Sequence, residues 1–351
     1  MMMAVPLTMK GVLLKGHGGP EMLEYCANIP VPTPNDHEVL VQVFAAGVNN
    51  TDINTRIGWY SKNDNNSDDA GWGGNALNLP RIQGADVCGQ IVAVGRSVNE
   101  ARIGERVLIE PCLYDVNGET MNPPWYFGSE CDGGFAEYTV ISSQHAHNVD
   151  STLSDVELAS FPCSYSTAEN MLTRADVRSG ERVLISGASG GVGSAAIQLA
   201  KARGATVIAI TSLSKSTQVL TLGADQVIDR DDHLVDVLGI NSIDVVIDLV
   251  AGEKWPQFLE VLRPKGRYAV SGAIGGALVE LDVRTLYLKD LSFFGCTVLE
   301  PEVFGNLVQH IEQGRIKPLV AKTFRLEQIQ QAQSAFQEKN HVGKIVLSVG
   351  R

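Results

Sequence analysis

The sequence lacks the features of a membrane protein, a nucleic-acid-binding protein or a disulfide-stabilised secreted protein. No apolar run approaches the roughly 20 residues that a membrane helix needs. The formal net charge is −12, so no general basic surface is available for nucleic acid or anionic lipid. The six cysteines are scattered without a C-x-x-C pair, which is typical of reduced thiols. We read residues 1–9 as an ordinary start rather than a signal peptide, and we expect a cytoplasmic location.

Clustered metal ligands are also lacking. The seven histidines do not group, and His145 and His147 fall on an apparent strand without cysteine support. Cys112 and Cys131 stand alone in their stretch of chain, and the sequence leaves open whether they interact. Structural zinc sites use four closely spaced cysteine or histidine ligands. We therefore expect no metal.

The first part of the chain, to about residue 160, reads as short strands between turns. Residues 39–44, 90–94 and 107–109 are apolar or alternate, and Gly, Pro, Asn and Asp bound them. Residues 61–80 and 114–134 are rich in Gly, Asn and Pro, and we expect two long surface loops there. This part therefore predicts a mostly β region.

The pattern changes after residue 178, where short β-branched runs alternate with helical patterns. Helices are predicted at 193–203 and 254–262, and further on at 304–313 and 327–338. Alternating strands and helices at this spacing are typical of a parallel sheet covered on both faces. The predicted strands are 182–186, 206–210, 226–228, 244–248 and 267–271, with a last one at 344–349.

The segment 182–204, RVLISGASGGVGSAAIQLAKARG, carries the strongest motif. A strand leads into Gly187-x-x-Gly190-x-x-Gly193, and a helix follows directly. The glycines permit a sharp turn, a close approach of backbone to a pyrophosphate and tight helix–strand packing. The helix N-terminus then offers free N–H groups to the phosphates. This context predicts a dinucleotide site rather than a ligand-free turn.

The end of the next strand indicates which dinucleotide is bound. NAD-binding folds place Asp or Glu there to hold the ribose hydroxyls, but this chain reads Thr211-Ser212-Leu213-Ser214-Lys215. Ser212 and Lys215, with Arg230 after the third strand, suit a 2′-phosphate, so we predict NADP(H). The alternative is that both cations are ordinary solvated charges.

Seven segments along nearly the whole chain resemble the medium-chain dehydrogenase/reductase superfamily, and in particular its zinc-independent quinone oxidoreductases related to zeta-crystallin. The resemblance implies an α/β protein with a GroES-like, mostly β catalytic domain (1–164 and 297–351) and a Rossmann parallel-sheet domain (165–296), with the active site between them. The matching segments are HEVLVQVFAAGVNNTD (37–52), GADVCGQIVAVG (84–95), IGERVL (103–108), GGFAEYTVI (133–141), ASGGVG (188–193), LYLKDLSFFGCTV (286–298) and HVGKIVL (341–347).

Zinc-dependent members of that superfamily carry Cys, His and Cys at three positions. By the resemblance, these positions are Asn49, Ala85 and Cys163 here. A catalytic zinc needs three protein ligands, and one thiol cannot hold it. Cys163 then reads as a small buried hydrophobic residue.

The resemblance also implies roles for particular residues. Asn49 would contact the nicotinamide or a substrate oxygen, and Tyr60 would stack on the acceptor or donate a proton, although Tyr60 as a mere rim aromatic stays open. We read Asp52 and Arg56 as an i, i+4 helix pair. The cofactor-binding residues would be Thr167, Gly187, Ser189, Gly190, Gly191, Val192, Gly193, Ser212, Lys215, Arg230, Gly272, Ala273 and Lys344, the last of which reads equally well as a surface charge.

Without a metal Lewis acid, alcohol oxidation is disfavoured. We expect an NADPH-dependent reductase that transfers hydride to a small quinone or α,β-unsaturated carbonyl acceptor. The alternatives are an enoyl-thioester or alkenal reductase, a zinc-type alcohol dehydrogenase that has lost its metal, and a non-catalytic NADPH-binding protein. The apolar stretch 291–299 predicts an edge strand that needs cover, and we expect a homodimer paired there.

Overall fold

The computed structural model describes residues 5–61 and 70–350, which form two compact units. One unit, called here the β unit, contains Met1–Cys163, Pro318–Asn340 and Lys344–Arg351. The other, called the α/β unit, contains Ser164–Lys317 and His341–Gly343. In the described part of the chain, no helix is long and apolar enough to cross a membrane.

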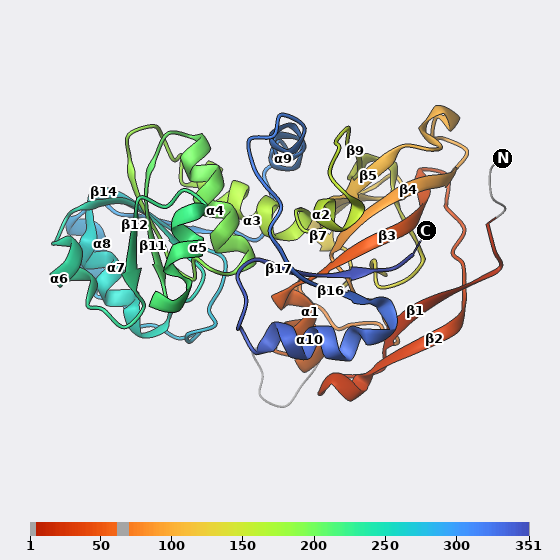
Figure 1. The fold of residues 1–351 in the computed structure, drawn as a ribbon, viewed down its shortest axis with the longest axis horizontal. Helices are drawn as coiled ribbons and strands as arrows, with labels where there is room; N and C mark the ends of the chain where they lie inside the picture. The colour runs from red at the N-terminus through yellow and green to blue at the C-terminus, as the bar shows by residue number, and fades with distance from the viewer. Residues whose placement is uncertain (1–4, 62–69, 351) are drawn as a thin grey trace. The chain divides into compact units, whose positions relative to one another are not determined.

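A seven-stranded sheet forms the centre of the β unit, in the order β16-β17-β3-β4-β5-β9 with β8 added on β3 (Figure 1). Its strands are β3 (Glu38–Val48), β4 (Asp86–Val94), β5 (Arg106–Ile109), β8 (Tyr138–Ser142), β9 (Ala146–Asn148), β16 (Val320–Arg325) and β17 (Lys344–Ser348). Valine, leucine and isoleucine side chains of these strands make the core, as their high β-propensity predicts.

Smaller elements surround this sheet. Two further antiparallel pairs are β1 (Thr8–Leu14) with β2 (Leu23–Pro30), and β6 (Cys112–Val116) with β7 (Glu119–Tyr126). The helices are α1 (Asn50–Ile57), α2 (Asp155–Leu158) and α10 (Ile329–Gln337), with 3-10 turns η1 (Pro20–Met22), η2 (Glu100–Arg102), η3 (Ser143–His145) and η6 (Leu326–Gln328).

The α/β unit contains one six-stranded sheet in which all strands are parallel, in the order β12-β11-β10-β13-β14-β15. Counted along the chain, this is the order 3-2-1-4-5-6 of a dinucleotide-binding fold. The strands are β10 (Arg182–Ile185), β11 (Thr206–Thr211), β12 (Gln226–Asp229), β13 (Ile243–Asp248), β14 (Leu262–Val270) and β15 (Ser292–Gly295).

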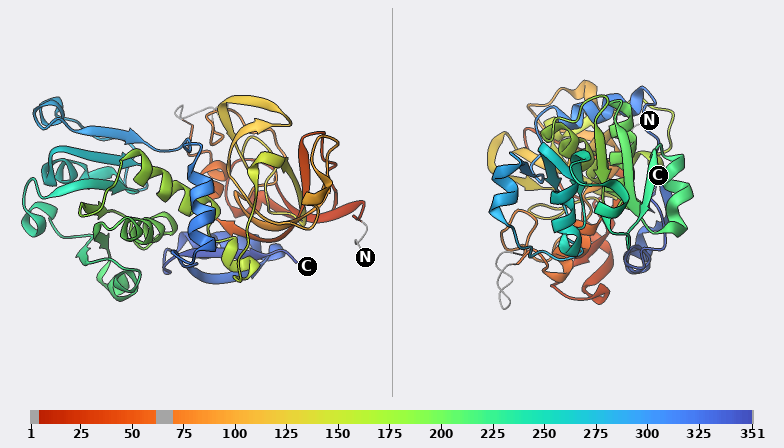
Figure 2. Two further views of the ribbon diagram at one scale, coloured as in Figure 1. Left: turned by 90° about the horizontal axis from the view of Figure 1, so that it is seen from above. Right: turned by 90° about the vertical axis from the view of Figure 1, so that its left-hand side faces the viewer.

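Helices cover both faces of this sheet, with α4 and α5 on one side and α6, α7 and α8 on the other (Figures 1 and 2). The helices are α3 (Pro162–Arg174), α4 (Gly191–Ala202), α5 (Ser216–Thr221), α6 (Leu234–Leu238), α7 (Trp255–Val261), α8 (Val283–Leu288) and α9 (Val303–Glu312), with turns η4 (Leu213–Lys215) and η5 (Gly252–Lys254). The predicted α/β fold class with a parallel sheet is confirmed.

The predicted long loop at 114–134 is wrong for its first half. Residues up to Tyr126 belong to the β6–β7 hairpin, whose turn contains Asn117 and Gly118 at φ 52° and 82°. Positive φ at both positions is the geometry of a two-residue hairpin turn, and Asn-Gly is its strongest sequence signal. The glycine and proline content of this segment is typical of a loop, but the Asn-Gly dipeptide is the signal that matches the structure. Of the other predicted loop, residues 62–69 lie outside the described chain, and 70–80 contain turns but no helix.

The two units divide the chain at different points from the predicted domains. Residues 297–317, which the prediction assigned to the catalytic domain, cluster with the α/β unit. Asn170 in α3 donates to the Val298 carbonyl at 2.9 Å, and Tyr165 donates to the Lys317 carbonyl at 2.8 Å. These hydrogen bonds tie the segment around α9 to α3.

Candidate functional site

The glycine-rich turn between β10 and α4 requires glycine at two of its three marked positions. Gly187 has φ +57°, a conformation that is costly for other residues. A Cβ on Gly193 would lie 2.3 Å from the Gly187 carbonyl oxygen, so α4 can begin this close to the strand only with glycine there. Gly190 precedes α4 and donates to Gly187 O at 3.0 Å.

The first turn of α4 presents backbone donors. The first helical hydrogen bond runs from Ser194 N to Gly190 O at 2.9 Å, so the N–H groups of Gly191, Val192 and Gly193 lie ahead of the helical ladder. A helix N-terminus of this kind favours phosphate. Ser189 lies in the same turn, and its carbonyl accepts the Gly343 N–H at 3.1 Å.

Two cations lie at the carboxyl ends of β11 and β12, as predicted. Ser212 precedes η4, Lys215 ends η4, and the Arg230 N–H donates to Thr211 O at 3.0 Å. Burial, and then the positive charge of Arg230, lower the pKa of Lys215. Two cations that repel each other at a strand end favour an anionic ligand.

Sequence reasoning missed Asp229, which ends β12 beside these cations. Its Oδ2 accepts the Leu213 N–H at 3.2 Å, and its Oδ1 accepts the Asp231 N–H at 2.9 Å. The carboxylate therefore holds backbone turns around Ser212. Adjacent parallel strands end at the same edge of the sheet, which was the signal available.

The end of β13 lies beside the glycine-rich turn. A Cβ on Gly187 would meet Val250 at 3.2 Å, and one on Gly272 would meet the Leu249 carbonyl at 2.6 Å. Gly272 and Ala273 follow β14, so the structure brings them to the same strand ends. Thr167 is half-buried in α3.

A second missed residue, Asp248, organises these strand ends. It is fully buried and accepts hydrogen bonds from the Ser186 and Tyr268 hydroxyls. It also accepts the Val250 N–H at 2.9 Å and the Ala251 N–H at 3.1 Å. The buried DVVID strand is the signal that its terminal carboxylate needs donors.

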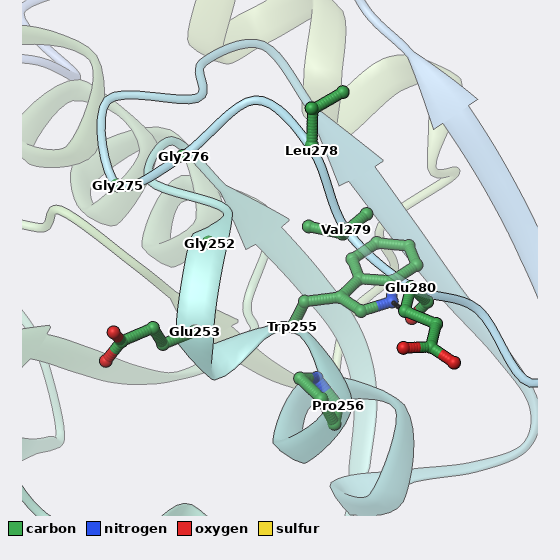
Figure 3. Close-up of a pocket in the computed structure, with 9 residues that line it drawn as sticks. All are labelled: Gly252, Glu253, Trp255, Pro256, Gly275, Gly276, Leu278, Val279 and Glu280. Carbon is green, nitrogen blue, oxygen red and sulfur yellow. Dashed lines mark hydrogen bonds between the residues drawn. The ribbon is translucent and has the colours of Figure 1, made fainter.

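A hollow of about 290 Å³ in the α/β unit lies between η5 and the loop after β14 (Figure 3). The Trp255 indole N–H donates to the Glu280 carbonyl at 3.0 Å. The charged side chains of the lining, Glu253 and Glu280, are both carboxylates. This hollow is therefore unsuited to phosphate.

In the β unit, Asn49, Asp86, Cys163 and Lys344 come together. Asn49 Nδ2 donates to Asp86 Oδ2 at 2.8 Å, and the Cys163 backbone N–H donates to Asp86 Oδ1 at 2.5 Å. Lys344 Nζ lies 2.8 Å from Asp86 Oδ2 and donates to Asn49 Oδ1. Lys344 is 2% exposed, so its reading as a surface charge is wrong.

Tyr60 lies near this cluster and not on an open surface. Its hydroxyl donates to Thr51 Oγ1 at 3.2 Å, and its ring meets Trp59 edge-on. Burial raises the pKa of Tyr60, with Cys163 among the smaller contributors. The phenol therefore stays protonated at neutral pH and can donate a proton.

The predicted Asp52–Arg56 pair is wrong. Asp52 accepts the Asn49 N–H at 2.7 Å as the acidic member of a capping box at the start of α1. Arg56 donates to Gln333 Oε1 at 2.8 Å and to the Gly18 carbonyl at 2.6 Å. Both partners of Arg56 are remote in sequence, and helix spacing carries no information about them.

The three positions where zinc-dependent relatives place ligands lie together here. Asn49 and Cys163 both contact Asp86, which follows Ala85 directly. An amide, a methyl group and one thiol do not form a three-ligand zinc set. Among the residues that the structure describes, no group of three His, Cys, Asp or Glu side chains is placed to hold a metal, and none of the six cysteines forms a disulfide.

Comparison with known proteins agrees with the division of the chain into a β unit and an α/β unit. Residues 35–151 match the family model described as alcohol dehydrogenase GroES-like domain, and residues 191–313 match zinc-binding dehydrogenase. Human quinone oxidoreductase is 30% identical over 97% of both chains. An NAD-dependent alcohol dehydrogenase of Sulfurisphaera tokodaii is also 30% identical, over 97% of this chain and 99% of that protein.

Among solved structures, a putative alcohol dehydrogenase from Sinorhizobium meliloti is 45% identical, with a TM-score of 0.91, and the match covers 98% of this chain and 97% of that one. A GroES-like β unit joined to a six-stranded parallel sheet with a glycine-rich turn defines a two-domain oxidoreductase. The chain belongs to the medium-chain dehydrogenase/reductase superfamily, with relatives in its quinone oxidoreductase branch.

The buried Asp52 makes stability depend on pH. Burial raises the pKa of Asp52 from an ordinary 3.8 to about 7. Between those values the folded protein keeps a proton that the unfolded chain has lost, so stability falls as pH rises through this window. Asp52→Asn should remove this slope, and because a pKa difference of one corresponds to about 1.4 kcal/mol, the effect should exceed about 1 kcal/mol.

Denaturant unfolding at pH 5 and pH 8 measures this prediction. The exposed Glu119→Gln is the control and should keep the wild-type slope. A slope in Asp52→Asn equal to that of the wild type would show that another group carries the pH dependence.

Proposed function

We propose that the protein is a metal-independent, NADPH-dependent reductase of quinones or α,β-unsaturated carbonyl compounds. The observation that carries the proposal is the chemistry around Asp86. The positions equivalent to zinc ligands are Asn49, Ala85 and Cys163, and the charged neighbours are an ammonium and a carboxylate. The quinone oxidoreductase relatives support the acceptor class.

NADPH is supported by the fit of the α/β unit. Glycine is required at Gly187 and Gly193, which keeps backbone exposed where a pyrophosphate would bind, and α4 offers its first N–H groups. Ser212, Lys215 and Arg230 suit the additional 2′-phosphate. Asp229 ends β12 and accepts the Leu213 N–H. We therefore do not assign it the role of the carboxylate that binds the ribose hydroxyls at the end of β11 in NAD-binding folds.

When bound, the cofactor supplies a hydride to an electrophilic carbon of the acceptor. The chain must then steady the oxygen on which negative charge develops and deliver one proton to the product. Tyr60 carries a proton on its phenolic oxygen at neutral pH, as tyrosine ordinarily does, and burial raises its pKa further. Asn49, the predicted contact of the nicotinamide or a substrate oxygen, is held by Asp86 and Lys344.

The cofactor preference predicts a selective loss. Lys215→Met/Arg230→Met should raise the Kd for NADPH by about 10²- to 10⁴-fold, because the two charge-assisted hydrogen bonds to phosphate are each worth about 1.5–3 kcal/mol. The Kd for NADH should stay within about twofold. Fluorescence titration measures both, with the exposed Lys322→Met as control. Equal losses for the two dinucleotides would contradict a 2′-phosphate site.

Turnover tests the function itself. NADPH oxidation at 340 nm should occur with members of a panel of quinones, enals and enoyl thioesters, and it should persist after exhaustive chelation. Tyr60→Phe should lower kcat by about 10² to 10⁴, the usual contribution of a general acid, whereas the peripheral Tyr25→Phe should not.

NADPH binding without oxidation by any acceptor would favour a non-catalytic role instead. One tightly held zinc per chain by elemental analysis would overturn metal independence.

We also propose a homodimer formed at the edge of the parallel sheet. β15 is the outer strand of that sheet, and the preceding α8 exposes Val283, Tyr287 and Leu288. Light scattering should give twice the mass of one chain. Leu288→Asp should reduce it to one, because it places a charge in an apolar contact, whereas Leu220→Asp in α5 should not. A wild-type monomer would refute the proposal.

A further inference from the structure

Four chain segments converge on the carboxyl group of Asp86. Asp86 begins β4 and is fully buried. Its Oδ1 accepts the backbone N–H of Cys163, in the first turn of α3, at 2.5 Å. Its Oδ2 meets Asn49 Nδ2, at the start of α1, and Lys344 Nζ, at the start of β17, both at 2.8 Å.

The side chains of Asn49, Asp86 and Lys344 close a triangle. Asn49 donates to the carboxylate through Nδ2 and accepts from the ammonium through Oδ1. Turning the amide over would place its NH₂ against the ammonium and its oxygen against the carboxylate. Both contacts are repulsive, so the ion pair fixes one orientation of the Asn49 amide.

The triangle also packs directly on the backbone. A Cβ on Gly47 would lie 2.4 Å from Asp86 Oδ2 and 2.8 Å from the Ala159 carbonyl oxygen. Only glycine at position 47 therefore leaves the space beside β3 that the Asp86 carboxylate occupies.

The residues that the reduction needs are attached to this triangle. Asn49 is the N-cap of α1, and Thr51 in the first turn of α1 accepts the Tyr60 hydroxyl at 3.2 Å. A displacement of Asn49 would move the start of α1 and with it the partner of Tyr60. Misplacing reacting groups by about 1 Å can cost about 10²-fold in rate.

We infer that Asp86 and Lys344 are positioning residues for the reduction: their buried ion pair orients Asn49 and the start of α1, and neither touches the acceptor. The inference rests on the proposed function, because it concerns the geometry of that reaction. A buried ion pair is in general a weak source of stability. Removing both charges together therefore separates a role in positioning the reacting groups from a role in stability.

The test compares Asp86→Asn, Lys344→Met and the double variant Asp86→Asn/Lys344→Met. Each single variant leaves one buried charge unpaired and should lower Tm by several degrees. The double variant removes both charges with little change in volume and should recover most of the Tm. Its kcat should nevertheless stay about 10- to 100-fold below wild type.

A matched control is the ion pair between Arg267 and Glu181, toward the amino ends of the parallel strands. Arg267→Met/Glu181→Gln should leave kcat unchanged.

A second measurement does not depend on the double variant folding. Lys344→Ala truncates the side chain and leaves a space that a small amine fits. Added ethylammonium should raise its kcat several-fold, whereas tetramethylammonium at the same ionic strength should not.

Recovery of both Tm and kcat in the double variant would overturn the inference, as would the absence of amine rescue. If the wild-type protein fails to oxidise NADPH with every acceptor of the panel, the proposed function is refuted, and the inference with it. The two failures are thereby distinguished.

Discussion

A buried carboxylate requires hydrogen-bond donors around it, and in the β unit several chain segments supply such donors to Asp86. The donors arrive from the end of β3, from the start of α3 and from β17, which are far apart in sequence. Lys344 supplies the opposite charge, and the buried ion pair anchors this part of the β unit. Gly47 is the cost of that arrangement, since no larger residue fits beside the carboxylate.

The α/β unit contains a similarly buried carboxylate at the end of β13. Asp248 is as buried as Asp86, and it also collects backbone N–H groups and side-chain donors where a strand stops. Asp248 fixes the loop that follows β13, whereas Asp86 holds the starts of α1, α3 and β17, and the candidate binding residues lie on or beside these segments. The strand ends thus provide rigid support, and the loops beside them carry the residues that are candidates for binding the cofactor and the substrate.

The dinucleotide site was predictable because its signals are local. Gly187, Gly190 and Gly193 define a turn whose geometry depends on a few consecutive residues, and the strand and helix around it follow from their periodicity. The pairing of Arg56 with Gln333 and Gly18, and the burial of Lys344, depend on tertiary neighbours that spacing does not reveal. The β6–β7 hairpin has a local signal in Asn117-Gly118, but the glycine and proline content of residues 114–134 is typical of a loop and predicts the wrong structure there.

The adjacent residues Gly343 and Lys344 contact different parts of the chain. The Gly343 N–H holds the carbonyl of Ser189 in the glycine-rich turn, and the next side chain holds Asp86. For protein engineering, this peptide bond is a poor place for an insertion, since one extra residue would release one anchor or the other. The exposed tip at Asn117 and Gly118, which carries neither duty, is the natural position for a tag or an inserted domain.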